Sequence, residues 1–85
     1  MNAKYIIGYI PGKIIGAGAI GPIIIPAWCD HAETARKLNI TDIKSAGFVK
    51  ICSDATIDCY GRANSLNIDS GKYDDISLSR MLFGN

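Results

Sequence analysis

The fold of this chain is decided by residues 5–29, which read YIIGYIPGKIIGAGAIGPIIIPAWC and carry a single charge, Lys13. An apolar stretch of this length must be weighed as a membrane-spanning helix. Three prolines, Pro11, Pro22 and Pro26, each remove a backbone donor and interrupt a helix, and five glycines weaken what remains. Lys13 would also lie near the bilayer centre, at a cost of about 2.5–3.5 kcal/mol. We therefore predict no membrane segment.

A secretory signal is the second alternative for this stretch. Lys4 provides a basic start, and residues 17–19, Ala-Gly-Ala, resemble a cleavage site. Pro11 and Lys13, however, interrupt the apolar region that a signal needs. The chain has three cysteines, an odd number that argues against a disulfide framework and for a reducing compartment. The sequence therefore predicts a cytoplasmic protein, with a targeting segment as the alternative.

Isoleucine use indicates that the apolar stretch forms strands. The chain has 15 isoleucines, nine of them before residue 26, and β-branched side chains favour a pleated sheet over a helix. Because apolar residues point to both faces of such strands, both faces need a cover, and a second subunit often provides one of them. The predicted strands are Lys4–Ile10, Lys13–Ile15 and Ile23–Ile25, the last continuing to Trp28, with a turn at Pro11-Gly12.

Three glycines in the stretch have the spacing of a dinucleotide-binding turn, G-x-G-x-x-G, at Gly16, Gly18 and Gly21. That site also needs a helix opening at the third glycine and an acidic residue about 20 positions later. Residues 22–26, Pro-Ile-Ile-Ile-Pro, are a poor start for a helix. Asp42 lies 21 residues after Gly21, but no complete βαβ unit fits before it. We therefore predict a glycine loop between two strands and no nucleotide cofactor.

A short helix is predicted for Asp30–Asn39. Its first four residues, Asp-His-Ala-Glu, have the pattern of a capping box, in which Asp30 accepts from an exposed N–H and Glu33 reaches back. Arg36 and Lys37 suit the negative end of the helix dipole. The small side chains on the predicted buried face indicate close packing on the sheet; this face carries Ala32, Ala35 and Leu38.

The one histidine and the three cysteines of the chain form a candidate zinc site. Such a site would use Cys29, His31, Cys52 and Cys59, but their spacing lacks the C-x2-C knuckle of the common zinc ribbons. A Cys–His nucleophile pair would also need an orienting acid or amide, and none is clearly placed. The preferred interpretation is a histidine in the first turn of a helix and three buried thiols. We therefore predict no enzyme, no catalytic residue and no bound metal, with a zinc-stabilised domain as an alternative.

Strands Phe48–Ser53 and Ile57–Arg62 are predicted to form a hairpin around the three-residue loop Asp54-Ala55-Thr56. A two-residue loop would place Asp58 opposite Ile51 on the core face, which is costly. The three-residue loop groups Val49, Ile51, Ile57 and Cys59 on one face, and Phe48, Lys50, Cys52, Asp58, Tyr60 and Arg62 on the other. The two strand cysteines then point to opposite faces and cannot bridge each other.

The second of these faces carries a candidate interaction surface made of Phe48, Lys50, Tyr60 and Arg62. Two rings among two cations are typical of platforms that bind single-stranded nucleic acid. The net charge of the chain is only +1, so no bulk electrostatic attraction to nucleic acid is expected. Nucleic-acid binding is therefore an alternative function, and the simpler explanations are an ordinary solvent-exposed face or a face that packs against a helix.

The last third of the chain is predicted to contain a strand, a turn and a helix. The strand is Ser65–Asp69 and the turn is residues 70–72. The helix begins with Asp74 or Asp75 as its cap, continues to Phe83 and ends at Gly84. Its apolar residues are too evenly spread for a helix in free solvent, so we expect it to close the core or to bind another chain.

Several short motifs resemble a group of small phage and prophage proteins that have no assigned activity. They are Ser45-Ala46-Gly47-Phe48, Cys59-Tyr60-Gly61-Arg62, Ser65-Leu66, and an aspartate followed by an apolar ending. The resemblance covers roughly half of the chain. It implies at most an accessory role and gives no catalytic residues to carry over.

Together these patterns predict one α+β domain over residues 1–85: two layers, with a mostly antiparallel sheet, a short middle helix and a short C-terminal helix. A chain this short buries only roughly 60–65% of its unfolded surface, so it is marginally stable without a partner, a metal or a disulfide. The leading hypothesis is a non-enzymatic interaction protein. We expect it to self-associate as a dimer through its isoleucine-rich strands or C-terminal helix and to occupy a surface on a partner protein.

Overall fold

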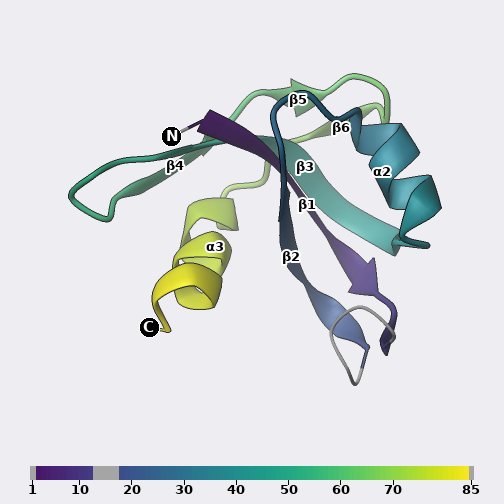
Figure 1. Cartoon of the computed structure of the whole chain (residues 1–85), viewed down its shortest axis with the longest axis horizontal. Coiled ribbons are helices and arrows are strands. Elements are labelled where there is room, and N and C mark those ends of the chain that lie inside the picture. The colour runs from purple at the N-terminus through teal and green to yellow at the C-terminus, as the bar shows by residue number, and fades with distance from the viewer. Residues whose placement is uncertain (1, 13–17, 85) are drawn as a thin grey trace.

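The computed structural model describes residues 2–12 and 18–84 and contains one main sheet, one small sheet and two helices (Figure 1). The main sheet is antiparallel, with strand order β2-β1-β3-β4. The predicted α+β class, with its mostly antiparallel sheet, middle helix and C-terminal helix, is confirmed. The elements are β1 (Asn2–Ile10), β2 (Ala19–Ile25), α2 (His31–Lys37), β3 (Thr41–Ile51), β4 (Ile57–Tyr60), β5 (Arg62–Ala63), β6 (Ile68–Asp69) and α3 (Asp74–Phe83).

The apolar N-terminal stretch forms the first two strands, as its isoleucines indicate. β1 and β2 pair directly, and Gly21 lies opposite Gly8 inside this ladder. The residues after Gly21 therefore continue a strand, and no helix opens there, as predicted. The predicted continuation of β2 to Trp28 is wrong, because the chain turns after Ile25 and the N–H of Cys29 donates to the carbonyl of Pro26 at 3.0 Å.

Other predictions for this stretch lie outside the described residues. They are the short strand Lys13–Ile15 and the first glycine of the fingerprint, Gly16. No helix in the described part of the chain combines the length and the apolar character needed to cross a membrane.

The strand β3 is much longer than predicted, because it begins at Thr41 rather than at Phe48. Its first half is rich in polar and small residues, which have low strand propensity, so its conformation is set by pairing with β1. The pairing is irregular: Ile7 faces Ser45, but Tyr9 faces Thr41, so three residues of β3 bulge out opposite Gly8. A side chain at Gly8 would come within 2.8 Å of the Thr41 carbonyl oxygen, and only glycine fits there.

The two helices cover opposite faces of the sheet (Figure 1). The upper face, which carries Ile6 and Ala46, packs against α2 and the small β5–β6 sheet. The lower face, which carries Tyr5 and Val49, packs against Leu78 of α3. Since successive side chains of a strand alternate in direction, β1, β2 and β3 each contribute to both cores. The central strands are thus covered on both sides within one chain.

The helix α2 begins as the capping pattern predicts. The Asp30 carboxylate accepts from the N–H of Glu33 at 3.0 Å. The Glu33 side chain does not complete the box; it forms an ion pair with Lys37 at 2.8 Å instead. The helix ends at Lys37, two residues earlier than predicted, because Asn39 adopts a left-handed conformation with φ of 55°.

In the β3–β4 hairpin, the side chains lie on the predicted faces, but the loop begins one residue earlier than predicted. Phe48 pairs with Tyr60, and Ile51 pairs with Ile57. The N–H of Cys52 donates to the carbonyl of Thr56 at 3.0 Å, so the three loop residues are 53–55 rather than 54–56. Moving the loop by one position shifts the pairing by two residues, and each side chain keeps its predicted face.

Candidate functional site

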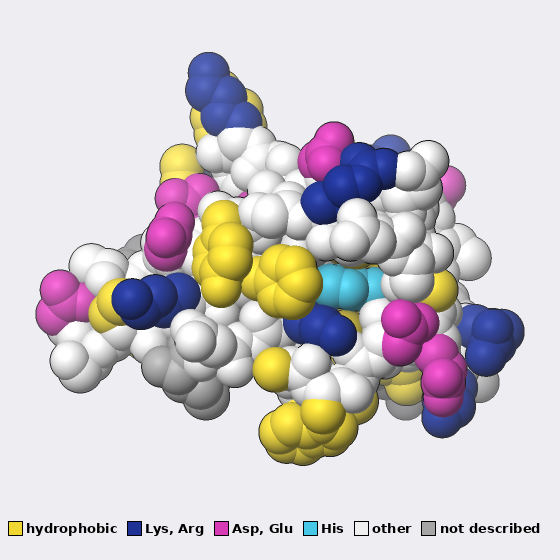
Figure 2. Space-filling model, turned by 90° about the horizontal axis from the view of Figure 1, so that it is seen from above, with side chains coloured by type: hydrophobic (Ala, Val, Ile, Leu, Met, Phe, Trp, Pro, Cys, Tyr) yellow, Lys and Arg dark blue, Asp and Glu magenta, His cyan; other side chains and the backbone are white. Residues whose placement is uncertain are grey.

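Three rings line up on the upper face of the sheet, and we call His31, Phe48 and Tyr60 the aromatic row. Phe48 and Tyr60 are cross-strand partners with ring centroids 5.8 Å apart and ring planes 25° apart. The His31 ring meets Phe48 edge-on, at 5.8 Å and 89°. Figure 2 shows hydrophobic side chains beside the histidine on this face. Two residues of the predicted interaction surface are therefore in contact, and His31 is an addition.

The backbone of two glycines holds the aromatic row in place. The buried His31 donates from Nε2 to the Gly47 carbonyl at 2.8 Å. Gly61 has φ of 80°, and a side chain there would come within 2.9 Å of the Phe48 ring. Tyr60 is 44% exposed, whereas Phe48 is half-buried. Tyr60 is thus the member of the row whose ring is open to a ligand.

The two predicted cations of this surface differ in how accessible their charged groups are to a ligand. Lys50 is exposed and lies opposite Asp58 on the same face as Tyr60. Arg62 donates to Asp69 at 2.7 Å and also to Asn67, so its guanidinium is engaged within the β5–β6 sheet. A ligand on this surface could therefore stack one flat ring on Tyr60 and contact the ammonium of Lys50. The surface thus offers two contacts, fewer than the four residues of the prediction.

The zinc candidates do not gather. His31 lies on the upper face, while Cys59 packs against the lower core. Cys52 and Cys59 occupy opposite faces of the hairpin, as predicted. Within residues 2–12 and 18–84, no group of three or more His, Cys, Asp or Glu side chains could hold a metal ion. The three cysteines, Cys29, Cys52 and Cys59, are free thiols. They are only partly buried, so the prediction that all three are buried is wrong.

A buried carboxylate that the sequence did not indicate ties α3 to the sheet. Asp74 is only 5% exposed. Its oxygens accept from the Ser45 hydroxyl at 2.8 Å, from the Gly71 N–H at 2.6 Å and from the Tyr5 hydroxyl. We call Asp74, Tyr5, Ser45 and the Gly71 N–H the Asp74 cluster. Its two oxygens accept three hydrogen bonds, so the carboxylate is a hydrogen-bonded structural group rather than a free base.

The predicted role of Asp74 or Asp75 as the helix cap is therefore wrong. The N-cap is Tyr73, whose side chain makes no capping hydrogen bond to the described chain. Asp74 is the first helical residue and turns toward the sheet, because the hydroxyl of the buried Tyr5 and that of Ser45 need an acceptor. A sequence signal did exist: Tyr5 falls at an inward position among isoleucines, and a buried tyrosine usually needs a hydrogen-bond partner.

Two groups have raised pKa values because of the Asp74 cluster: Tyr5, which belongs to it, and Cys59, which lies near it. Burial, together with the bond to Asp74, raises the pKa of Tyr5 far above its ordinary value. Burial and the negative charge of Asp74 raise the pKa of Cys59 from 9.0 to about 12. A thiol with such a pKa is a poor nucleophile at neutral pH. Cys59 is therefore not a candidate catalytic residue.

These pKa values predict a loss of stability in alkali. A raised pKa in the folded state means that the folded chain binds more protons than the unfolded chain once the pH exceeds the ordinary value. Stability is then complete below pH 9.0, where the ordinary pKa of Cys59 lies, and declines as the pH rises. The slope is up to about 1.4 kcal/mol per pH unit for each group. Urea unfolding at pH 8, 9, 10 and 11 measures it.

Cys59→Ala provides the control for the alkaline decline. The variant should lose the part that begins near pH 9 and keep the later part that Tyr5 contributes above pH 10. Identical pH profiles for the two proteins would contradict the assignment to Cys59.

The outward side of α3 carries an apolar row that the fold leaves uncovered. Tyr73, Ile76, Arg80 and Phe83 are spaced three, four and three residues apart, so they share one side of the helix. This side lies opposite the buried Leu78. Tyr73, Ile76 and Phe83 are 64%, 52% and 43% exposed. We call these four residues the outer row of α3.

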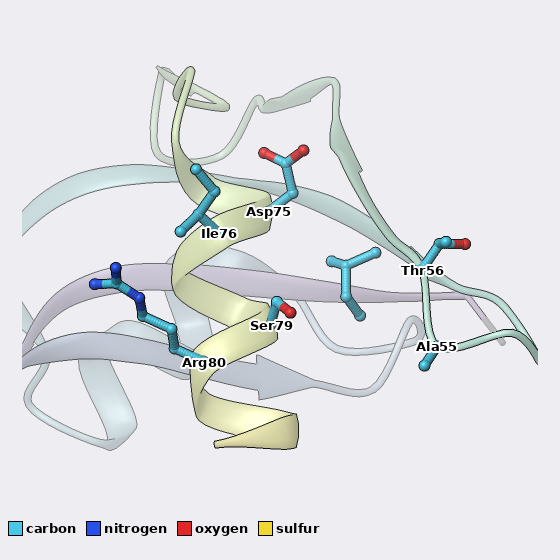
Figure 3. A pocket seen from close by; sticks show the side chains of 7 residues that line it. Ala55, Thr56, Asp75, Ile76, Ser79 and Arg80 are labelled. Carbon is cyan, nitrogen blue, oxygen red and sulfur yellow. The ribbon is translucent and has the colours of Figure 1, made fainter. Parts of the chain in front are cut away.

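A hollow of about 460 Å³ lies beside the outer row, between α3 and the β3–β4 hairpin (Figure 3). Ile76 and Arg80 project one turn apart from the same side of the helix. The hairpin contributes Ala55, Thr56 and Ile57 to the wall. The hollow has the size of a small-molecule site, but its polar groups do not converge on a common point.

Among the described residues, the most exposed large apolar side chain is that of Trp28, which is 87% exposed in the turn after β2. Its indole adjoins two hollows. One, of about 440 Å³, is bounded by α2 and has charged walls that include Asp30, Glu33 and Lys37. The other, of about 330 Å³, is bounded by uncharged residues, which are Asn2, Ala3, Ile24, Ile25, Pro26 and Ala27.

Comparisons of this chain with protein-family models, with curated proteins and with solved structures find no match. The resemblance to small phage and prophage proteins stays a prediction.

Proposed function

We propose that this protein is a small non-enzymatic protein–protein interaction module that self-associates. The observation that carries the proposal is the exposure of large apolar side chains although both faces of the sheet are already covered. A helix that packs one side on a core needs only one apolar stripe, yet α3 exposes a second stripe through Ile76 and Phe83. Trp28 adds a separate exposed apolar group. Exposed apolar clusters of this kind mark contact surfaces.

The edges of the sheet support contact through side chains rather than through strand pairing. β2 is an edge strand and carries Pro22 at its middle, where proline withholds a backbone donor from any added strand. The opposite edge, β4, is only four residues long. Neither edge offers a long ladder to another chain, so association through apolar side chains is the favoured mode.

The hydrogen bonds of the buried ionisable side chains favour a non-enzymatic role. Within the described residues, the buried Asp74 carboxylate accepts three hydrogen bonds, and His31 donates from Nε2 to the Gly47 carbonyl. The outer row of α3 offers a single cation, Arg80, among apolar side chains. A partner protein that binds there would present apolar groups with one carboxylate facing Arg80. We also propose that the protein has an accessory role, comes from a phage and acts in the cytoplasm. A phage gene cassette around its gene would support the phage origin.

Sedimentation velocity over a concentration range tests self-association. The expected result is a dimer fraction that rises with concentration from the micromolar to the millimolar range. A protein that stays monomeric at the highest concentration would contradict the proposal. Light scattering on the same samples separates a defined dimer from open-ended aggregation, which would also count against it.

A second candidate function is the binding of single-stranded nucleic acid on the aromatic row. The stacked pair of Phe48 and the exposed Tyr60 favours it, because an open ring beside Lys50 can stack a base. Fluorescence anisotropy of a labelled single-stranded oligonucleotide tests it. Tyr60→Ala should weaken binding roughly 5- to 150-fold, whereas Tyr73→Ala, an exposed tyrosine on α3, should not. Absent or salt-insensitive binding would remove this candidate.

A further inference from the structure

We propose that the helix α3 is a lid on the lower face of the sheet. The lid comprises α3 and the turn before it, residues 71–84, and it opens as one body while the sheet, α2 and the upper core stay folded. The Asp74 cluster is the latch that holds the lid closed. Opening uncovers the lower face, including Tyr5 and the thiol of Cys59. This motion takes place within one copy of the chain and does not require self-association.

The two cores of the protein are separate, so one can open without the other. Among the described residues, the upper core contains none from α3, whereas the lower core includes Leu78. The main sheet lies between the two cores, and its ladder joins β2, β1, β3 and β4 without using either helix. When α3 leaves, the sheet therefore keeps its backbone pairing and its upper cover. Such units open at a lower free energy than the whole chain needs to unfold.

The attachment of α3 to the sheet is small. Within the helix, Asp74 and Leu78 are the buried residues. Beyond Leu78, the last turn is exposed, including Met81, Leu82 and Phe83. On the side of the β3–β4 hairpin, the hollow of about 460 Å³ interrupts the contact between helix and hairpin (Figure 3). The buried contact of α3 therefore rests on one leucine and one carboxylate.

The latch is polar, and water can replace its bonds to the sheet. In the closed state, the Asp74 carboxylate accepts from the hydroxyls of Tyr5 and Ser45. When the lid opens, the carboxylate and both hydroxyls become hydrated, so none of them is left buried without a partner. A hydrogen bond that is exchanged for water changes the free energy little, whereas exposing a large apolar contact is costly. A polar latch therefore fixes the orientation of α3 and still opens at a modest cost.

The chain just before α3 provides the hinge. Ser70 is held in place, because its N–H donates to the Gly61 carbonyl at 3.0 Å. The next residues form a turn that is closed on itself. The Gly71 N–H donates to the Asp74 carboxylate at 2.6 Å, and the Asp74 N–H donates to the Gly71 carbonyl at 3.3 Å. This turn can move with the helix, so the hinge lies between Ser70 and Gly71.

Native-state hydrogen exchange, measured by mass spectrometry, tests the lid. The protection factors of the α3 amides should be at least about tenfold lower than those of β1. Their exchange should depend only weakly on urea, because opening α3 exposes much less surface than unfolding the chain.

A matched pair of variants separates opening of the lid from global unfolding. Leu78→Val and Ile40→Val each remove one methylene, the first from the lower core and the second from the upper core. Leu78→Val should speed the exchange of α3 roughly 2- to 12-fold. Ile40→Val destabilises the closed and the open forms equally, so it should speed the exchange of β1 and leave that of α3 within about twofold. Circular dichroism confirms that each variant is folded.

Two further measurements complete the test. Leu82→Val controls for placing a β-branched residue in the helix; Leu82 is exposed, so α3 exchange should change less than about threefold. Cys59 provides a second readout, because it packs against the same core as Leu78. Burial and the charge of Asp74 raise its pKa to about 12, so its alkylation by iodoacetamide is slow while the lid is closed. Leu78→Val should speed this alkylation as it speeds α3 exchange, whereas Ile40→Val should not.

The outcomes decide between a lid and a helix that leaves only with the whole fold. If Ile40→Val speeds α3 exchange and Cys59 alkylation as much as Leu78→Val, the lid is overturned. Protection of α3 equal to that of β1, or alkylation unchanged by Leu78→Val, also overturns it. If Leu82→Val acts like Leu78→Val, the exchange reports fraying of the helix and the lid is again overturned. A chain that is monomeric at every concentration would remove the proposed function and leave the lid intact.

Discussion

Replacing Asp74 by alanine is expected to lower the free energy of unfolding by about 4 kcal/mol. The substitution leaves the Tyr5 hydroxyl, the Ser45 hydroxyl and the Gly71 N–H without their acceptor. Each unpaired buried donor costs about 1–3 kcal/mol, with some relief from relaxation and water. A domain of this size has a total stability of about 4–13 kcal/mol. The variant should therefore be partly unfolded at 37 °C, as urea denaturation will measure.

The neighbouring aspartate is the matched control for this substitution. Asp75 occupies the next position of α3 but is exposed, so Asp75→Ala should change stability by no more than about 0.5 kcal/mol. Asp74→Asn keeps one acceptor oxygen and should fall between the two. If Asp74→Ala proves as stable as Asp75→Ala, the Asp74 cluster does not hold α3 on the sheet.

Replacing Gly47 by alanine is the second substitution with a large expected effect. A methyl group there would lie 2.6 Å from the Tyr60 carbonyl oxygen and 3.3 Å from Cβ of Ser70. Both contacts are too close, and the first is with backbone of the neighbouring strand, which cannot move without breaking the β3–β4 pairing. The carbonyl of Gly47 also accepts from His31. We expect a loss of about 3 kcal/mol in the free energy of unfolding, measured by thermal and urea denaturation.

Gly21→Ala distinguishes this crowding from a general effect of glycine replacement. Gly21 also lies in a strand of the main sheet, but a side chain there would meet no described atom within 4 Å. Its replacement should be neutral or stabilise the fold by up to about 1 kcal/mol, because alanine restricts the unfolded chain. Equal losses for the two variants would contradict the close approach at Gly47.

The strands of the apolar stretch and the faces of the hairpin could be predicted because they depend on local pattern. Isoleucine enrichment marks β1 and β2, and the period of two assigns Phe48 and Tyr60 to the same side. The first half of β3 could not be found in this way. Apart from Thr41 and Ile43, its residues do not favour a strand, and pairing with the neighbouring β1 determines their extended conformation.

The candidate site was predictable only in part, for the same reason. The contact between Phe48 and Tyr60 follows from the hairpin alone. The engagement of Arg62 with Asp69 depends on the two-residue strands β5 and β6, which have no clear pattern in the sequence. The role of Asp74 depends on residues 69 and 29 positions away in the chain. Rules based on the spacing of residues in the sequence cannot identify partners that are so far apart in the chain.

The hydrogen bond between Tyr5 and Asp74 can form only late in the synthesis of the chain. The two residues are 69 positions apart, and ribosomes add about 5–20 residues per second. The tyrosine of a nascent chain must therefore wait about 3–14 s for its acceptor. Throughout that interval, the underside of the sheet lacks the helix that will cover it. A cell making this protein would face its greatest risk of aggregation then, and chaperones that recognise exposed isoleucine would have their opportunity to bind.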